Sequence, residues 1–295
     1  MPDATALAGT LQQTLTMATP LLLAALGETV VQKSGVVNVG MEGMMLCGAF
    51  GATLATLWTG NPLIGVAAGA GVGILTALLL AAVAVRMAAD QIVCGIVINL
   101  LAMGVTGTVY QRMFGRREVG LSTASLPHVI GDQTVLFVLA IAMVPAIWYW
   151  LAHTRSGLEL RACGEQPIAA NAAGIDVLNI RTLCTLFGGA MAGIAGSCLS
   201  VGSSNTFVPE MTAGRGYIAL AIVTAGRWSP SGCLAAALVF GFADALQYRG
   251  QSIGIHISKD LLLALPYIAT LAILAVGFAG RGGPAALGVS YRQEG

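Results

Sequence analysis

The chain has 295 residues, of which 56% are hydrophobic and only 9% are charged, and its formal net charge is +1 at pH 7. Soluble domains carry about 25% charged residues, so this composition and a mean hydropathy of +0.82 indicate an integral membrane protein. The near-neutral charge argues against a basic nucleic-acid-binding surface. The polar stretches between the apolar segments are too short for a separate soluble domain. We therefore expect residues 1–295 to form a single membrane-spanning domain.

The first apolar helix is expected from about Leu11 to Leu26, with Pro20 as a kink. No basic residue precedes Lys33, so the stretch lacks the charged beginning of a secretory signal, and we expect the helix to be retained. The region Gly27 to Gly51 is rich in glycine and polar at its start, and it continues into the second helix.

Asn38 and Glu42 lie inside what otherwise reads as the start of an apolar span. If Val37 to Met45 is helical, these two residues, four apart, share one face. A carboxylate within the membrane costs about 2.5 to 3.5 kcal/mol and usually faces water, a partner or the interior of the bundle. Two interpretations remain open. Glu42 borders a solute path, or its carboxylate accepts backbone N–H groups from a neighbouring broken helix.

Further apolar segments are long enough to approach or cross a hydrocarbon core about 30 Å thick, which needs about 20 helical residues. They are Thr56 to Val85, Ile92 to Tyr110, Val135 to Leu151, Leu183 to Val201 and Leu261 to Gly280. No segment of about ten residues with alternating apolar and polar side chains recurs, as membrane-spanning strands would require. We therefore expect an all-α polytopic membrane protein with about seven to ten transmembrane helices. Some of these helices are expected to be interrupted or re-entrant.

Two patterns in the first half point to contacts between helices. Gly65, Gly69 and Gly73 follow the turn at Asn61-Pro62 with the spacing GxxxGxxxG, which lets another helix approach closely, either in the transport core or in ordinary membrane packing. Gln91, Gly95 and Asn99 then repeat every four residues and form a polar stripe on the fourth helix. The amides suit a neutral polar solute, or they form hydrogen bonds between helices.

The two halves resemble each other weakly, because TGNPLIGVAAGAG and GRWSPSGCLAAAL each combine a proline turn, a nearby glycine and a helix of small residues. Asn205, Phe207 and Glu210 precede Tyr217 to Gly226, which is too short to span alone and fits a half-helix, and Asp244 lies in the helix that follows. Paired interrupted segments in corresponding positions indicate a transport site near the membrane midplane. The predicted path residues are therefore Asn38, Glu42, Gln91, Asn99, Asn205, Phe207, Glu210 and Asp244.

The connection from His153 to Arg181 contains a short helix of its own. Pro167 follows Glu165 and Gln166, and Gly174 comes after an alanine-rich stretch. Proline at the start and glycine just past the end are typical of a helix, here one of about two turns. We interpret it as a short helix that projects from the loop between two membrane helices, or as an ordinary surface helix.

The sequence contains no motif that indicates a catalytic or cofactor-binding site. The histidines at 128, 153 and 256 have no metal-binding spacing, the six cysteines form no CxxC pair, and the phosphate-binding sequence GxxxxGK[ST] is absent. We therefore expect no enzyme activity and no cofactor or metal on this chain. An ATP-driven cycle would need another subunit to hold ATP and magnesium.

Four segments in the same order carry a family resemblance that runs from about Ala25 to Leu246. They are GVVNVGMEGMMLCGAFGA, ADQIVCGIVINLLA, GLELRACGEQPIAANAAGIDV and GRGYIALAIVTAGRWSPSGCLAAALVFGFADAL. Together they resemble the permease subunits of bacterial ABC importers of the ribose/branched-chain amino-acid permease superfamily, and most of all its nucleoside-uptake branch.

The resemblance implies a multi-pass subunit of the cytoplasmic membrane that moves nucleosides by alternating access. Its partners would be ABC ATPase subunits, a second related permease chain in a heterodimer, a soluble substrate-binding protein or lipoprotein outside the membrane, and membrane lipid. It also implies that the short helix is the cytoplasmic coupling helix that contacts the ATPase. The residues so assigned are Glu165, Pro167, Ala169, Ala170, Asn171 and Gly174.

Three alternatives remain. A permease for a ribose-type sugar or for branched-chain amino acids would share this architecture. An ion-coupled secondary transporter would need no coupling helix. An intramembrane enzyme is the weakest alternative, because the sequence offers no nucleophile and base.

Overall fold

The computed structural model of the chain describes residues 2–115, 123–131, 133–252 and 283–292. Most of this part is helical and only five residues lie in strands, so the predicted all-α membrane fold is confirmed. Six of the described helices are long and apolar enough to cross a membrane. The predicted last span, Leu261 to Gly280, and the histidine at position 256 lie outside the described residues.

The described helices and strands have the following order along the chain. The first are α1 (Pro2–Lys33), α2 (Met41–Thr59), α3 (Pro62–Leu80) with its π-helical continuation η1 (Ala81–Arg86), and α4 (Gln91–Phe114). A two-stranded antiparallel hairpin of β1 (His128–Ile130) and β2 (Gln133–Thr134) precedes α5 (Val135–His153), α6 (Arg155–Glu165) and α7 (Pro167–Ala172). Then come α8 (Val177–Ser197) with its π-helical continuation η2 (Cys198–Ser204), α9 (Arg215–Ala225) and α10 (Pro230–Ser252).

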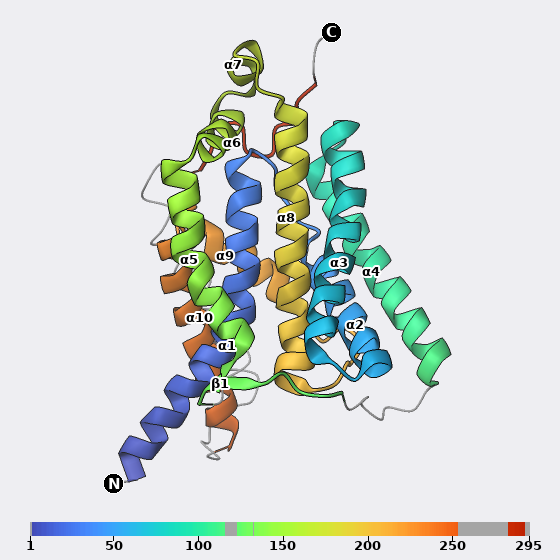
Figure 1. Cartoon of the computed structure of the whole chain (residues 1–295), viewed down its shortest axis with the longest axis vertical. Helices are drawn as coiled ribbons and strands as arrows, with labels where there is room; N and C mark the ends of the chain where they lie inside the picture. Colours follow the sequence, from blue (N-terminus) through green and yellow to red (C-terminus); the bar gives the residue numbers. More distant parts are fainter. Residues whose placement is uncertain (1, 116–122, 132, 253–282, 293–295) are drawn as a thin grey trace.

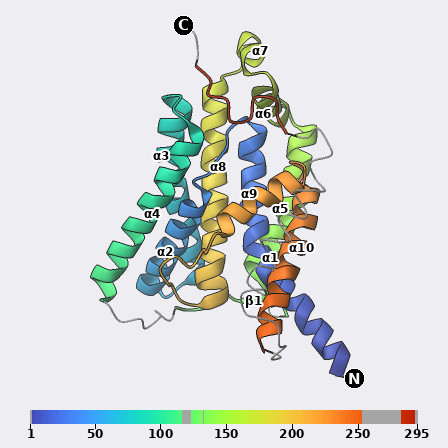
Figure 2. The same cartoon turned by 180° about the vertical axis from the view of Figure 1, so that it is seen from behind.

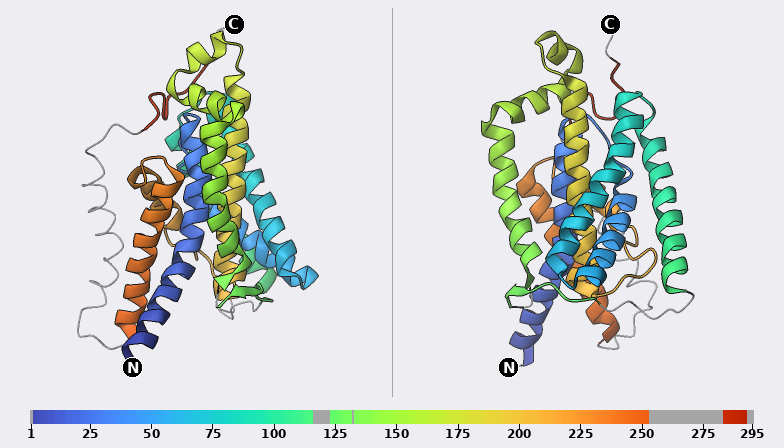
Figure 3. Two further views of the ribbon diagram at one scale, coloured as in Figure 1. Left: turned by 60° about the vertical axis from the view of Figure 1, so that its left-hand side comes forward. Right: turned by 45° about the vertical axis from the view of Figure 1, so that its right-hand side comes forward.

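The bundle has two distinct ends. At one end lie α6, α7 and the segment 283–292, and we call it the coupling end after the role predicted for α7. The hairpin and the start of α1 lie at the other end (Figure 1). Seen from behind, α4 forms one edge of the molecule and α10 the other (Figure 2). The spans of α1 and α8 are 83% and 78% buried, against 28% for those of α3, α4 and α5, so α1 and α8 form the core. Figure 3 shows both of them between the outer helices.

Each half of the chain contains a non-helical segment between two helices. α1 continues past its predicted end at Leu26 to Lys33, and residues 34–40 then form a non-helical segment before α2 begins at Met41. In the second half, a non-helical segment, residues 205–214, leads to the eleven-residue α9. The predicted half-helix at Tyr217 to Gly226 is therefore confirmed, with its start two residues earlier.

The glycine stripe of α3 permits direct backbone contact with its neighbours. A Cβ atom on Gly69 would lie 2.1 Å from the Ser197 hydroxyl, and one on Gly73 would lie 2.1 Å from the carbonyl oxygen of Gly189. Since real side chains do not tolerate such distances, α3 packs against α8 only because these positions are glycine. This is the packing interpretation of the stripe.

Substitution of Gly73 should show how much the bundle depends on this contact. We expect Gly73→Ala to destabilise the detergent-solubilised protein by about 1 to 3 kcal/mol through overpacking, measured as a lower midpoint of thermal unfolding. Gly71→Ala in the same helix is the control, because a Cβ there would meet nothing within 4 Å. Equal midpoints for the two variants would contradict the close packing of α3 on α8.

Candidate functional site

The first turns of the two interrupted helices meet at a single carboxylate. Glu42, in the first turn of α2, accepts hydrogen bonds from the backbone N–H of Gly214 through Oε1 at 2.8 Å and of Gly216 through Oε2 at 2.6 Å. Both amides belong to the start of α9, where free N–H groups and the helix dipole create positive potential. A Cβ on Gly216 would lie 2.6 Å from the Glu42 Cα, so only glycine allows this approach.

Asn99 of α4 holds the start of α2 in the same way. Its Oδ1 accepts from the N–H of Gly43 at 2.8 Å, while its Nδ2 donates to the carbonyl of Val39 at 3.0 Å and to the hydroxyl of Tyr217 at 2.8 Å. Tyr217 lies in the first turn of α9. One amide therefore joins α4, α2 and α9.

The rest of the α4 stripe supports the non-helical segment. The Gln91 Oε1 accepts from the N–H of Val37 at 2.8 Å, and a Cβ on Gly95 would lie 2.7 Å from the backbone nitrogen of Gly40. Gln91 and Asn99 are 3% and 4% exposed. Asn99 thus forms the contacts between helices that were one interpretation of the spacing, while Gln91 bonds to the non-helical segment. The place of both residues on a solute path stays a prediction.

The predicted common helical face of Asn38 and Glu42 is wrong. Asn38 precedes α2 in a non-helical stretch, because Gly35 has a φ of +93° and the helix begins only at Met41. Its side chain is fully buried, its N–H donates to Glu28 Oε1 at 3.1 Å, and its amide contacts the Met44 sulfur at 3.3 Å. Asn38 and Glu42 therefore have different surroundings.

Sequence analysis missed a polar cluster near the end of α1. Glu28 is fully buried and its Oε1 also accepts from Gln32 Nε2 at 2.9 Å, while Gln32 Oε1 accepts from the indole N–H of Trp228 at 2.6 Å. Glu28 and Gln32 are four residues apart, which is the helical spacing that could have indicated them. The predicted end of the helix at Leu26 hid this pattern.

The predicted path residues of the second half have different surroundings. Phe207 is fully buried, with its ring centroid 4.9 Å from that of Phe50 and 5.7 Å from that of Tyr110. Asn205, with a φ of +50°, and the exposed Glu210, with a φ of +61°, lie in the segment before α9. Asp244 is buried on α10, which packs mainly on α1.

The coupling end contains a two-helix unit where only one short helix was predicted. α6 ends at Glu165, and α7 follows directly over Pro167–Ala172, with Gly174 at a φ of +84° ending the turn. Ala170 is 4% exposed and packs with Cys163 and Val177, so its side chain faces the protein. Ile168 and Ala169 are exposed and form the outer face of α7 together with Ala172.

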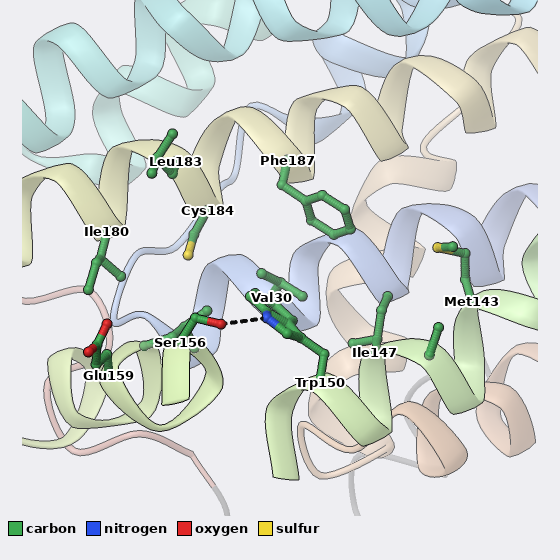
Figure 4. Close-up of a pocket in the computed structure, with 12 residues that line it drawn as sticks. Val30, Met143, Ile147, Trp150, Ser156, Glu159, Ile180, Leu183, Cys184 and Phe187 are labelled. Carbon is green, nitrogen blue, oxygen red and sulfur yellow. Dashed lines mark hydrogen bonds between the residues drawn. The ribbon is translucent and has the colours of Figure 1, made fainter. Parts of the chain in front are cut away.

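A cavity of about 620 Å³ lies beside α6, between α5 and α8. Figure 4 shows Met143, Ile147 and Phe187 along its wall, and Trp150, which donates its indole N–H to the Ser156 hydroxyl at 2.9 Å. Glu159 and Ser156 are the polar residues of the lining. This mostly apolar lining suits hydrocarbon better than a polar solute.

Comparison with known proteins gives the family. Residues 10–279 match the family described as branched-chain amino acid transport system / permease component. The chain belongs to this permease family. It is a multi-pass protein of the cytoplasmic membrane and a permease subunit of the ABC transporter type.

Several curated permeases are similar over nearly the whole chain. The guanosine ABC transporter permease protein NupQ of Bacillus subtilis is 36% identical, with 94% of each chain covered. The nucleoside ABC transporter permease protein NupC of Lactococcus lactis is 33% identical, also with 94% of each covered. The putative glucose ABC transporter permease protein TsgC13 of Haloferax volcanii is 36% identical, with 91% of each covered.

A solved structure shares the fold. PsaBC from Streptococcus pneumoniae in complex with Fab matches with a TM-score of 0.55 at 11% identity, covering 93% of this chain and 91% of that one. At this identity the match concerns the fold alone. Within the described residues, no group of three or more His, Cys, Asp or Glu side chains is arranged to hold a metal ion.

Replacement of Glu42 should loosen the start of α9. Glu42→Gln keeps one acceptor oxygen and removes the charge, which should cost about 1.5 kcal/mol or more. We therefore expect the amides of Gly214 and Gly216 to exchange with solvent deuterium at least about tenfold faster. Glu210→Gln, an exposed carboxylate in the preceding segment, should leave their exchange unchanged. Unchanged exchange in Glu42→Gln would show that the two hydrogen bonds do not hold α9.

Proposed function

We propose that this permease is the transmembrane subunit of an ATP-driven importer that moves nucleosides across the cytoplasmic membrane. The observation that carries the proposal is the meeting of two interrupted helices, α2 and α9, at Glu42. Interrupted helices in both halves of a transporter form solute sites where their ends meet. The names of the guanosine and nucleoside permeases among its relatives support the choice of solute.

The charge at this site favours a neutral solute. In transporters with half-helices, the positive N-terminus often binds an anionic group of the substrate. Here both amides at the start of α9 already bond to the carboxylate of Glu42. An amino-acid carboxylate would meet a negative charge in place of free donors, so a branched-chain amino acid fits this site poorly.

Tyr217 supplies an aromatic surface beside the same carboxylate. Its side chain is 45% exposed, and its hydroxyl is fixed by the amide of Asn99 at 2.8 Å. Stacking of a nucleobase on an aromatic ring contributes about 1 to 3 kcal/mol. Phe207 cannot serve this purpose in the described arrangement, because Phe50 and Tyr110 cover its ring.

A sugar is the second candidate solute, because the similar permease of Haloferax volcanii is described as a putative glucose transporter. A sugar is also neutral and can pack on an aromatic ring. The site geometry therefore supports both nucleoside and sugar over an amino acid.

The surfaces of the chain support the proposed membrane and protein partners. Large apolar side chains are exposed along α3 and α4, including Leu75, Leu79, Val97 and Leu100, which suits membrane lipid and a second, related permease chain. We propose that this second chain closes the path over Glu42 and Tyr217.

The outer face of α7 would contact an ABC ATPase, which hydrolyses ATP with magnesium. A soluble binding protein would deliver solute at the opposite end. An ion-coupled transporter would have no use for a projecting helix such as α7.

Solute competition tests the proposed substrate. In vesicles containing the complete complex, we expect unlabelled adenosine, guanosine and uridine to inhibit uptake of radiolabelled guanosine, because all share a neutral ribose and an aromatic base. Glucose, ribose and leucine serve as comparison solutes and should inhibit little. Strong inhibition by glucose or ribose, with labelled sugar taken up in place of guanosine, would replace the nucleoside by the sugar assignment.

A charge on α7 tests the ATPase contact. Ala169→Arg adds a long cationic side chain to the exposed face of α7 without disturbing the packing of Ala170. We expect the variant to insert normally but to retain less than about a tenth of the ATPase subunit on co-purification, a loss of about 1.4 kcal/mol or more. The control is Ala124→Arg, an exposed alanine at the opposite end. Normal retention by Ala169→Arg would mean that α7 is only a surface helix.

A further inference from the structure

The segment 283–292 binds to three parts of the coupling end that are distant in sequence. The N–H of Ala286 donates to the carbonyl of Gly164 at 2.9 Å, and that of Gly288 donates to the carbonyl of Gly35 at 3.0 Å. The Ser290 hydroxyl donates to the carbonyl of Ala89 at 3.3 Å. This segment, which we call the C-terminal strap, therefore joins the end of α6, the corner after α1 and the loop before α4.

Arg181 of α8 connects the same parts from inside the protein. It is 2% exposed, and its Nε donates to the carbonyl of Ser34 at 3.0 Å, Nη1 to that of Val289 at 2.9 Å and Nη2 to that of Cys163 at 3.4 Å. In the described part of the chain it has no carboxylate partner. The carbonyls at the ends of α1 and α6 carry negative potential, so they stabilise a cation that would otherwise be costly to bury.

The packing around Arg181 leaves no room for independent movement. A Cβ on Gly164 would lie 2.1 Å from the carbonyl oxygen of Lys33, and one on Gly35 would lie 2.5 Å from the Arg181 Nη2. The backbone of α6 thus lies directly on the end of α1. A displacement of α6 and α7 must also displace the start of segment 34–40.

We propose that Arg181 and the C-terminal strap act as a junction that transmits movement of α6 and α7 to segment 34–40, and through it to Glu42 and α9. Arg181 is a positioning residue in this role, because it acts through the backbone that it holds. The inference rests on the proposed function, since it takes α7 as the contact of the ATPase.

The far end of segment 34–40 makes this transmission mechanically direct. Gln91 and Asn99 hold Val37 and Val39, and α2 begins two residues later with Glu42 in its first turn. The same short stretch therefore has one end in the junction and the other at the candidate solute site. Few residues lie between them to absorb a displacement.

The test measures ATP-dependent movement near α9 without depending on the solute. A reporter cysteine replaces Val208, which is 50% exposed in the segment before α9, and a water-soluble maleimide labels it with and without ATP and vanadate. Among the native cysteines Cys94 is partly exposed and is replaced by alanine, while the other five are buried. Burial raises the pKa of the Cys163 thiol near the junction to about 11, so this thiol stays neutral and unreactive.

We call the chain that carries Val208→Cys and Cys94→Ala the reporter chain. In the complete complex, we expect ATP and vanadate to change the rate at which its cysteine at position 208 is labelled. Arg181→Gln and deletion of residues 284–295 should each reduce this change by on the order of fivefold or more, while ATP hydrolysis and assembly persist. The double variant should be no worse than the more severe single one, because both changes act on one junction. Arg181→Lys keeps the positive charge but loses the planar guanidinium with its several N–H donors. It should give an ATP-dependent change in labelling between those of the wild type and Arg181→Gln.

Arg155→Gln is the matched control, since Arg155 lies on α6 but its side chain is 92% exposed. An unchanged ATP-dependent labelling in both junction variants would overturn the inference, as would failure of both to assemble, which would give the junction a purely structural role. A reporter chain that binds its ATPase yet shows no ATP-dependent change would also overturn it. A reporter chain that binds no ATPase would instead contradict the proposed function on which the inference rests.

Discussion

The central constraint on this fold is that a helix interrupted within a membrane must satisfy its free backbone N–H groups without water. Each unsatisfied group in hydrocarbon costs several kcal/mol. The chain meets this requirement with side chains, since Glu42 binds two amides at the start of α9 and Asn99 binds an amide at the start of α2. The glycines around these contacts follow from the same constraint, because Gly95 and Gly216 allow the backbones to come within bonding distance of the polar groups.

This constraint explains which parts of the structure the sequence could predict. Hydropathy predicts α4, α5 and α8, and the short apolar run at Tyr217 predicts α9, because burial in lipid depends on local composition. The carboxylate of Glu42 makes the backbone contacts that were one of its two predicted roles. The prediction that Asn38 and Glu42 share one face is wrong, since a spacing of four residues defines a face only when the intervening chain is helical.

The parts that sequence analysis missed depend on contacts between distant residues. The partners of Arg181 are the carbonyls of residues 34, 163 and 289, and backbone carbonyls leave no signature in a sequence. Likewise, the six residues of α7 give no periodicity that would distinguish the buried Ala170 from the exposed Ala169, because the buried face is set by packing against Cys163 of α6 and Val177 of α8. The sequence could have predicted the cluster of Glu28 and Gln32, but only if the end of α1 had been predicted correctly.

The same hydrogen bonds restrict how the site can rearrange. Separation of α2 from α9 would expose the amides of Gly214 and Gly216 and leave a charged carboxylate unpaired, so the starts of these helices are expected to move as one unit. Flexibility must then lie in the connection that leads to α9, because Arg181 and Gln91 hold segment 34–40 in place. In that connection Asn205, Glu210 and Ala213 all have positive φ values, which is a conformation that non-glycine residues adopt at a cost. The braced unit is therefore joined to the rest of the fold by a tightly packed segment after α1 and by a strained connection before α9.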